Sequence, residues 1–492
     1  DYMLSEELQM IRDLAREVAQ DKIAPVAAHH DETGEFHINK CLTTPADPSD
    51  AVEEGIRGLL DRVPGFMPKI DEIIHGTTLV INAIIERKGA KTALITTRGF
   101  RDVLELGREL RYDAYDIFAE YPRPLVPRSL RHEVSERIAV DGRVIRDLDE
   151  KDVRRVLADV LELGIESLAV CLINSYENPV HEKKIQEIVH QAAPDLSLST
   201  SFEVLPQIRE YERTCTTATN AYVKPITAKY LTKLSSRLES LGFKGKLFIM
   251  LSIGGITSIE TARQFPVRII ESGPTAAVIA SQHYGRIFEI KDMFCFDMGG
   301  TTAKSCLIQK GQAGLVSTFE VGRVQRFKKG SGLPIQVPVV DLMEIGAGGG
   351  SIAKMSKMGL LQVGPESAGA DPGPACYGRG GENPTVTDAD LSNEESELAL
   401  GYARSLGEAW RVGAGTPPAA LIARYGLMAQ ARPYQRTVDT RHLNIQEDQG
   451  EGVIGHRLVV HPRGVKNDGP VIGGRLDIHG IQAGTHFGND LQ

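Results

Sequence analysis

The sequence predicts an α/β protein with mixed or parallel sheets, because strand-like and helix-like stretches alternate along it. From about residue 38 to 290, short apolar runs follow longer amphipathic ones. The strand-like run Thr92–Thr97 follows the helical stretch Leu79–Lys88, and Ser167–Leu172 follows the helical stretch Lys151–Leu163. This alternation is typical of layered α/β folds.

The same alternation continues through the middle of the chain. A helix at Ile226–Leu241 precedes a strand at Leu247–Leu251. Two further strands, Phe294–Phe296 and Ser305–Ile308, flank a turn rich in glycine. Helical periodicity ends near Ala431, so the last part of the chain is expected to have an irregular fold.

Composition excludes several classes of protein. The 492 residues are 41% hydrophobic and 25% charged, which is ordinary globular usage. A formal net charge of -9 provides no basic surface for nucleic acid. The chain has no apolar run of the roughly 18–20 residues that a membrane-spanning helix needs. Six cysteines without a C-x-x-C pair are typical of a cytoplasmic protein with reduced thiols.

The sharpest candidate site is the stretch DMGGTTAK, at residues 297–304. Glycines let backbone N–H groups approach a phosphate closely, and threonine hydroxyls add donors. An aspartate at a strand end can hold Mg²⁺ or orient an attacking group. The nucleotide-binding candidates are therefore Gly299 and Gly300, the catalytic candidates are Asp297, Thr301 and Thr302, and Asp297 is the candidate metal ligand. The alternative is a β-hairpin whose tight turn needs two glycines.

A second glycine cluster, IGAGGGS, follows about 45 residues later at 345–351. Such a stretch lets backbone pack against an adenosine or phosphate group. Its nucleotide-binding candidates are Gly346, Gly348, Gly349, Gly350 and Ser351. The alternative is a flexible surface loop. The chain has no G-x-x-x-x-G-K-[ST] motif, which argues against an ordinary P-loop.

Two more stretches each have a functional and a structural interpretation. In His75-Gly76-Thr77-Thr78, a threonine can cap the helix that follows, or the glycine can leave room for a ligand at the helix start. The long loop at 364–390 is either a linker or an ordered binding loop.

Two charged stretches are expected to be structural. The charges at Arg209–Arg213 have i,i+3 spacing and predict a solvated helix face. His181-Glu182 does not fit a zinc motif and predicts a helix start instead.

Several stretches, in a fixed order within residues 38–391, carry a resemblance to a known family. They are HGTTLVINAIIERKGAKTALITTRGFRDVLELGRE (75–109), CLINSYENPVHE (171–182), REYERTCTTATNAYVKP (209–225), ESGPTAAV (271–278), FDMGGTTAK (296–304), KKGSGLPIQVPVVD (328–341), IGAGGGSIA (345–353) and VGPESAGADPGPACYGRGG (363–381). Together they resemble the hydantoinase A / 5-oxoprolinase family, which includes ATP-dependent N-methylhydantoinase and ketone carboxylase subunits.

The resemblance implies an actin-like ATPase (ribonuclease H-like) fold of two α/β lobes, with ATP and Mg²⁺ as cofactors. It implies that ATP phosphorylates the oxygen of a cyclic amide or an enolised ketone, which a second large, hydantoinase B-like subunit of the oligomer then hydrolyses or carboxylates. By position, residues 296–304 match the second phosphate loop and 345–353 the adenosine-side loop. His75, Thr77, Thr78 and Arg108 are expected near the cleft or the substrate.

The chain departs from the family pattern at both ends. The D-x-G-G-T-F-T-D loop and its leading strand are not found before residue 38, and residues 4–36 instead resemble the N-terminal helix of acyl-CoA dehydrogenases. An unpaired sheet edge and weaker nucleotide binding are expected as a result. The predicted organisation is a helical segment at 1–37, an N-terminal region at 38–200, a core at 201–391 and a tail of unclear fold at 392–492.

Three hypotheses about function remain open. The first is a subunit of an ATP-dependent hydantoinase/oxoprolinase-type enzyme. The second is a catalytically incomplete family member that serves as a structural or interaction subunit. The third, from residues 4–36 alone, is a flavin-dependent acyl-CoA dehydrogenase. The sequence does not distinguish hydantoin, 5-oxoproline, other lactams and ketones as substrates, nor a hydrolase from a carboxylase.

Overall fold

The computed structural model describes residues 38–391, 442–447 and 457–461, with gaps at residues 40, 42–43, 45–46, 63–64, 66, 110–111, 114, 301, 326–327, 357–358 and 370–371. The chain divides into two units, Asp1–Pro462 and Arg463–Gln492, and every described residue belongs to the first. The predicted helical segment at 4–36 lies outside the described residues. Within the described part, no helix is long and apolar enough to cross a membrane.

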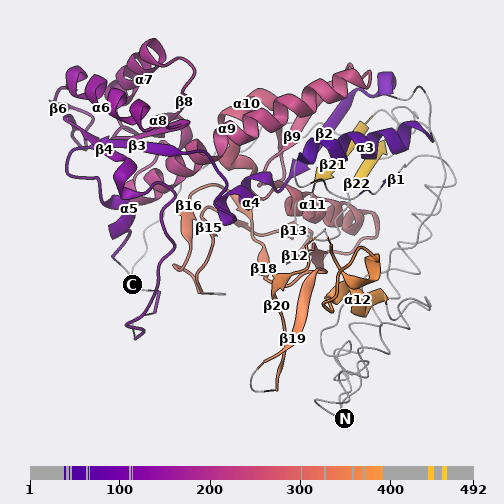
Figure 1. Cartoon of the computed structure of the whole chain (residues 1–492). Helices are drawn as coiled ribbons and strands as arrows, with labels where there is room; N and C mark the ends of the chain where they lie inside the picture. Colours follow the sequence, from indigo (N-terminus) through magenta and orange to yellow (C-terminus); the bar gives the residue numbers. More distant parts are fainter. Residues whose placement is uncertain are drawn as a thin grey trace, which may run out of the picture. The chain divides into compact units, whose positions relative to one another are not determined.

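A six-stranded mixed sheet contains the first glycine-threonine candidate, HGTT. Its order is β1 (Ile38–Asn39), β22 (Arg457–His461), β21 (His442–Glu447), β2 (Glu72–Thr77), β9 (Lys246–Met250) and β10 (Ile256–Ser258). The central strands β21, β2 and β9 run parallel, and Figure 1 shows β21 and β22 beside β2. Both sides of β2 are therefore paired, so the open sheet edge expected from the sequence is not found at β2.

A second sheet is entirely parallel, in the order β4 (Arg131–Val134), β3 (Thr92–Thr97), β7 (Ser167–Cys171) and β8 (Ser197–Thr200). Every residue of β3 and β7 is buried. Full burial of a parallel strand requires cover on both faces, which explains the continuous apolar centres Ala93–Ile95 of β3 and Leu168–Cys171 of β7. Helices α6 (Glu150–Glu162) and α7 (Val180–Ala192) pack on each other, and α9 contacts β3, β7 and β8.

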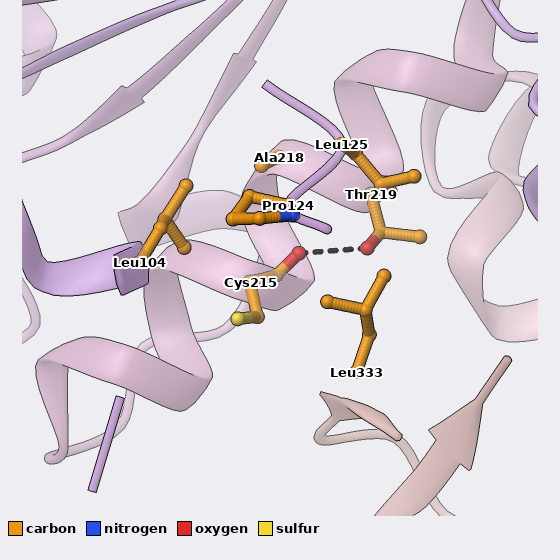
Figure 2. Close-up of a pocket in the computed structure, with 7 residues that line it drawn as sticks. All are labelled: Leu104, Pro124, Leu125, Cys215, Ala218, Thr219 and Leu333. Atoms are coloured by element: carbon orange, nitrogen blue, oxygen red, sulfur yellow. Dashed lines mark hydrogen bonds between the residues drawn. The ribbon is translucent and has the colours of Figure 1, made fainter. Parts of the chain in front are cut away.

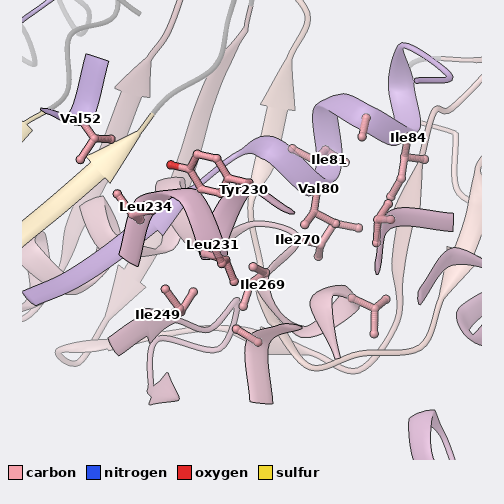
Figure 3. Close-up of a cluster of buried hydrophobic side chains, with 14 of the residues drawn as sticks. Val52, Val80, Ile81, Ile84, Tyr230, Leu231, Leu234, Ile249, Ile269 and Ile270 are labelled. Carbon is pink, nitrogen blue, oxygen red and sulfur yellow. The ribbon is translucent and has the colours of Figure 1, made fainter. Parts of the chain in front are cut away.

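Helix α9 (Glu210–Ser240) joins the cores of the two sheets. Its first half contributes Cys215 and Ala218 to the core of the parallel sheet, and its second half contributes Tyr230 and Leu231 to the core of the six-stranded sheet. Figure 3 shows Tyr230 and Leu231 among the buried aliphatic side chains of that second core.

The sequence predicts that this helix begins at Ile226, which is wrong because α9 runs through Pro225. A proline inside a helix removes one backbone hydrogen bond and usually breaks the helix. Here every residue from Glu212 to Val223 is buried, and packing on both sheets outweighs the loss. The solvated helix face expected at Arg209–Arg213 is therefore wrong, because Glu212 and Arg213 are buried. A helix buried all round has no amphipathic stripe, so periodicity does not reveal it.

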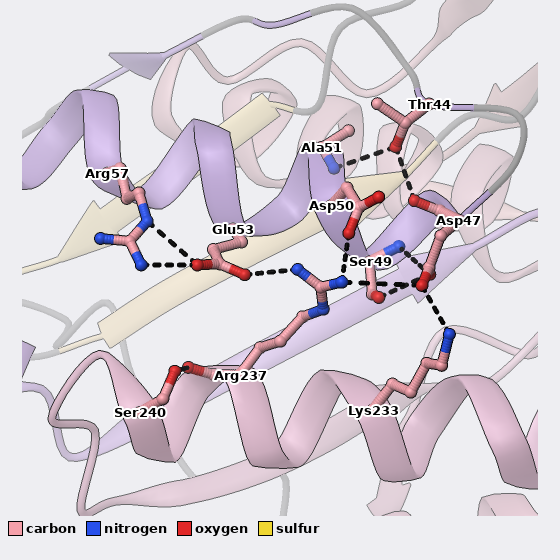
Figure 4. Close-up of polar contacts among 10 residues, drawn as sticks. All are labelled: Thr44, Asp47, Ser49, Asp50, Ala51, Glu53, Arg57, Lys233, Arg237 and Ser240. Carbon is pink, nitrogen blue, oxygen red and sulfur yellow. Dashed lines mark hydrogen bonds and ion pairs between the residues drawn. The ribbon is translucent and has the colours of Figure 1, made fainter.

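Ion pairs fasten the end of α9 to helix α3 (Pro48–Leu60). Lys233 Nζ lies 2.7 Å from the carboxylate of Asp47, the residue that caps α3. One guanidinium, that of Arg237, pairs with both Asp50 and Glu53 (Figure 4). The helix that joins the two cores is thus also attached to the element that precedes β2.

A buried carboxylate stands behind the carboxyl edge of the parallel sheet. Glu182 begins α7 as predicted, and its side chain accepts hydrogen bonds from the Leu172 N–H at 2.8 Å, the Ser201 hydroxyl at 2.6 Å and the Phe202 N–H at 3.0 Å. Burial raises the pKa of the Glu182 carboxyl above its ordinary value, although these donors act in the opposite direction. The Glu182 carboxylate therefore holds the segments that follow β7 and β8 in place, although removing its charge from water is unfavourable.

We predict that replacing Glu182 by Gln changes how stability depends on pH. Because its pKa is raised in the folded chain, Glu182 contributes stability that is fully present below its ordinary pKa of 4.5 and is lost as pH rises through the folded-state pKa. Gln does not titrate. Measured by calorimetry between about pH 4.5 and 8, the melting temperature of the wild type should fall relative to that of the variant as pH rises.

The control for this prediction is Glu177→Gln, since Glu177 is exposed on the loop before α7. Its melting curve should follow that of the wild type at every pH. A difference between Glu182→Gln and wild type that stays constant with pH would contradict the prediction.

Candidate functional site

The stretch DMGGTTAK forms the turn of a β-hairpin. Strands β11 (Met293–Met298) and β12 (Ala303–Gln309) pair in antiparallel register, with Asp297 opposite Lys304, as the two predicted strands require. The Gly299 N–H donates to the Thr302 carbonyl at 2.8 Å and closes the turn. Thr301 lies outside the described residues. The hairpin interpretation is thus correct for local geometry, but a hairpin turn does not exclude a phosphate-binding one.

The second glycine cluster packs directly on this turn. The N–H groups of Gly349 and Gly350 donate to the carbonyl oxygens of Gly299 and Gly300, at 2.8 and 2.7 Å. A Cβ at Gly348 would lie 2.5 Å from the Gly299 oxygen, closer than real Cβ contacts come. Two glycine clusters about 45 residues apart therefore meet backbone to backbone, and the second is not a free surface loop.

The loop at 364–390 closes around the same glycines. The Ala368 N–H donates to the Gly350 carbonyl and the Thr387 N–H to the Gly349 carbonyl, both at 2.8 Å. Together with strands β19 (Ser351–Met355) and β20 (Leu361–Ser367) and helix α12 (Val386–Leu391), the loop forms an ordered cover. The linker interpretation is therefore wrong for this stretch. We call the residues 299–300, 348–350, 368 and 387 the glycine junction.

Asp388 holds the far end of this loop in place. Its carboxylate is 3% exposed and accepts the N–H groups of Cys376 and Thr385, each at 2.7 Å. Burial, together with the nearby Asp388 carboxylate, raises the pKa of the Cys376 thiol to about 12. Cys376 is thus a neutral thiol at physiological pH, which makes it a poor nucleophile.

An ion pair connects the hairpin to helix α11 (Ser272–Ile287). Lys304 Nζ lies 3.5 Å from the carboxylate of Glu271, the residue that precedes α11, and the two side chains are 11% and 2% exposed. The Glu271 N–H in turn donates to the Ser252 hydroxyl at 3.0 Å. The carboxylate is thereby held at the positive end of a helix and beside a lysine.

The start of α11 also holds the HGTT stretch. The Ser272 hydroxyl accepts the Thr77 N–H at 3.0 Å and donates to the Thr77 carbonyl at 2.9 Å. A Cβ on Gly76 would lie 3.4 Å from the Ser272 carbonyl oxygen, so this glycine allows close backbone packing. His75 Nε2 lies 2.9 Å from the Tyr230 hydroxyl.

The predicted cap of the helix after HGTT is only partly right. Thr77 Oγ1 accepts the Leu79 N–H at 3.1 Å, whereas the Thr78 side chain makes no capping bond. The helix itself, α4 (Leu79–Ile85), is shorter than the predicted Leu79–Lys88. HGTT is therefore connected to the hairpin by the hydrogen bonds of Ser272 and by the neighbouring ion pair of Glu271 with Lys304.

Arg108 belongs to a different neighbourhood. Its guanidinium pairs with Glu212 at the start of α9, beside the core of the parallel sheet. That pair, with Glu212 only 4% exposed, provides a structural reason for an arginine at this position.

Three residues of the site were not singled out by the sequence: Glu271, Ser272 and Lys304. The strings ESGPTAAV and FDMGGTTAK contain them, but no spacing rule connects position 271 to 304 or 272 to 77. Only the packing of α11 on β2, β11 and β12 brings them together.

An apolar pocket lies apart from the glycine junction. It is lined by Leu104, Pro124, Leu125, Cys215, Ala218, Thr219 and Leu333 (Figure 2). The Thr219 hydroxyl donates to the Cys215 carbonyl inside α9 at 2.7 Å, so this lining offers little polar chemistry. Among the described residues, His, Cys, Asp and Glu side chains form no group of three or more that could hold a metal.

Comparison with known proteins identifies the family. The model of the hydantoinase/oxoprolinase N-terminal region matches residues 26–193, and the hydantoinase/oxoprolinase model matches residues 213–395. The chain belongs to the hydantoinase/oxoprolinase family. The second match contains both glycine clusters and the start of α11, so the glycine junction is part of the family core.

Curated relatives in this family include subunits of a caprolactamase and of an acetophenone carboxylase. Caprolactamase subunit alpha of Pseudomonas jessenii is 36% identical over 378 residues, which cover 76% of this chain and 52% of that protein. The gamma subunit of acetophenone carboxylase from Aromatoleum aromaticum is 33% identical over 376 residues, covering 73% and 50%. This hydantoinase-family chain thus spans about half the length of the curated relatives it matches.

A solved structure confirms the predicted fold class. The crystal structure of the ATP-dependent caprolactamase from Pseudomonas jessenii matches with a TM-score of 0.61 at 33% identity, over 77% of this chain and 57% of that one. The mixed α/β architecture is therefore the ATPase-type fold of this hydantoinase family.

We predict that Gly348→Ala separates the two glycine clusters. The added Cβ would collide with the Gly299 carbonyl, which is backbone and unable to swing aside. Overpacking of this kind costs about 1–3 kcal/mol. Denaturant unfolding followed by circular dichroism measures the loss.

Gly255→Ala is the matched control. A Cβ at Gly255 meets its nearest atom, Leu251 Cδ1, at 3.8 Å, which is ordinary van der Waals contact. The control should unfold like the wild type. Equal losses in the two variants would show that the close approach at Gly348 has no special role.

Proposed function

We propose that this chain is the nucleotide-binding part of an ATP-dependent subunit that activates a carbonyl compound by phosphorylation. The observation that carries the proposal is the glycine junction, where the turn after Asp297 is held by a second glycine cluster in a family with ATP-dependent members. Catalysis of phosphoryl transfer is mostly positioning and charge stabilisation, and a rigid backbone cradle provides the first of these.

The residues of the cradle divide into three roles. Gly300, Thr301 and Thr302 are proposed to contact the phosphates by backbone N–H and hydroxyl donors, next to Gly299, whose own N–H donates to the Thr302 carbonyl. The N–H groups of Gly349 and Gly350 are already used by the hairpin carbonyls, so these glycines hold the turn in shape. Gly346, Gly348 and Ser351 complete the adenosine side, where Ser351 Oγ accepts the Gly348 N–H at 2.9 Å.

Asp297 is the proposed ligand for Mg²⁺. Its carboxylate lies at the end of β11, directly before the turn, and is half-buried. Mg²⁺ in nucleotide sites is usually held by one or two carboxylates, phosphate oxygens and water, so a single aspartate fits this ion. The ion would neutralise charge on the phosphates, and we propose Asp297, Thr301 and Thr302 as the residues that assist the transfer.

The proposed substrate is a cyclic amide or a ketone. The caprolactamase and acetophenone carboxylase relatives suggest these two classes. In either case the terminal phosphoryl group of ATP would move to the carbonyl or enol oxygen, leaving ADP and an activated compound. His75, Thr77 and Thr78 are proposed to lie on the substrate side, since Ser272 and Glu271 connect them to the hairpin. Arg108 is left out because Glu212 binds it.

A second large, hydantoinase B-like subunit is part of the proposal. Relatives are named as alpha and gamma subunits, and this chain spans about half of their length. The hydrolysis or carboxylation step would occur in the assembly, in the cytoplasm. The alternative is an interaction subunit that does not turn ATP over, and substrate-dependent ATP hydrolysis by the chain, alone or with its partner, is the measurement that separates the two.

We predict that the wild-type chain binds Mg-ADP and that an Asp297→Ala, Gly300→Ala double variant binds it at least tenfold more weakly. The double variant loses the metal ligand and obstructs the approach of phosphate to the turn. Isothermal titration calorimetry measures both affinities, and circular dichroism shows whether the variant is folded. A folded wild type that does not bind Mg-ADP would overturn the proposed function.

A further inference from the structure

Lys304 is a cation in the described part of the hairpin that the proposed mechanism has not used. It opens β12 directly opposite Asp297 in the β11–β12 ladder, and side chains of directly opposed residues project from the same face of a sheet. Its ammonium therefore belongs to the same face of the hairpin as the proposed Mg²⁺ ligand. The side chain is 11% exposed, so it is largely removed from bulk water.

The partner of Lys304 is a more deeply buried group. Glu271 is 2% exposed and lies 3.5 Å from Lys304 Nζ. Charge-assisted hydrogen bonds are usually about 2.7–2.9 Å long, so this ion pair is loose. Because the attraction between two charges falls with distance, less electrostatic energy is lost when the lysine moves from Glu271 to another anion.

Glu271 has a second source of stabilisation that does not depend on Lys304. Its backbone N–H is held by Ser252, its carbonyl accepts the Thr275 N–H at 3.2 Å, and it lies at the N-terminus of α11, a helix of 16 residues. The positive end of a helix favours a carboxylate at this position. The position of Glu271 at the helix start is thus fixed independently of Lys304.

We propose that Lys304 is a phosphate-contacting residue that Glu271 holds in reserve while no nucleotide is bound. On binding, the ammonium leaves the Glu271 carboxylate for the phosphate chain beside Gly299 and Gly300. Glu271 competes with the nucleotide for the same cation, and so it sets the affinity of the site. This inference rests on the proposed function, because it requires a polyphosphate at that turn.

Because Glu271 competes with the nucleotide for Lys304, replacing Glu271 by Gln should raise the affinity for Mg-ATP. The amide keeps the shape of the side chain and removes the charge, which frees Lys304 for phosphate. The apparent dissociation constant falls when the binding-competent state is more populated. Calorimetric titration should therefore show that Glu271→Gln binds Mg-ATP severalfold more tightly than the wild type. A purely structural ion pair predicts unchanged or weaker binding.

The double variant Glu271→Gln, Lys304→Met separates the phosphate contact from stability. Lys304→Met alone leaves a buried carboxylate without its cation and is expected to fold poorly. The double variant removes both charges, so it should melt near the wild-type temperature. It should still bind Mg-ATP about tenfold to a hundredfold more weakly, the range for one lost charge-assisted contact. Its affinity should also depend less steeply on salt concentration.

The matched control is the exposed pair of Lys354 and Glu366, which join β19 to β20 at 2.8 Å with 43% and 64% of their side chains exposed. Glu366→Gln, Lys354→Met should leave affinity and salt dependence unchanged. If the wild type binds nucleotide, either of two results would overturn this inference alone. One is unaltered affinity in the Lys304 double variant, and the other is unchanged or weaker binding in Glu271→Gln. A wild type that binds neither Mg-ADP nor Mg-ATP would overturn the proposed function and this inference with it.

Discussion

The site depends on a backbone contact that tolerates no side chain. Gly349 and Gly350 donate to Gly299 and Gly300, and Gly348 approaches the hairpin so closely that a methyl group would overlap a carbonyl oxygen. Hydrogen bonds from Ala368 and Thr387 then use the carbonyl groups on the other side of the same glycines. Glycine gives backbone freedom at an entropic cost, and here the paired N–H and carbonyl groups fix that freedom in one arrangement. A turn that would be mobile as an isolated hairpin becomes part of a rigid junction.

Rigidity at the junction extends outward through α11 rather than through the sheets alone. The start of this helix meets the end of β2 through Ser272 and the hairpin through Glu271, while its length packs on β11 and β12. Helix α9 likewise connects the cores of the two sheets by contributing side chains to both. Lys233 and Arg237 attach this helix to α3. Two helices, each touching several elements, therefore place stretches that are more than 190 residues apart in sequence, such as Thr77 and Ser272, within hydrogen-bonding distance.

Sequence reasoning predicted the parts of the structure that have local signals. The strands β3, β7 and β11 were predicted because each is a short apolar run bounded by polar residues or glycine. The start of α9 is not predicted, because burial on all sides removes the amphipathic periodicity that indicates a helix. For the site, the glycine clusters have a local signature, but their contact with each other has none. The pairing of Lys304 with Glu271 is equally hidden, since it arises from the packing of a helix on a hairpin.

The nature of the Lys304–Glu271 pair follows from where each charge is held. The hairpin provides the lysine, and a separate helix start provides the carboxylate, so the pair joins two elements that the glycine junction does not join directly. A buried ion pair of this kind contributes little net stability, because desolvation offsets most of the attraction. Two apolar residues would fill the same space with less loss of hydration. The anionic ligand proposed for the turn beside Asp297 would give this lysine and this glutamate a role beyond stability.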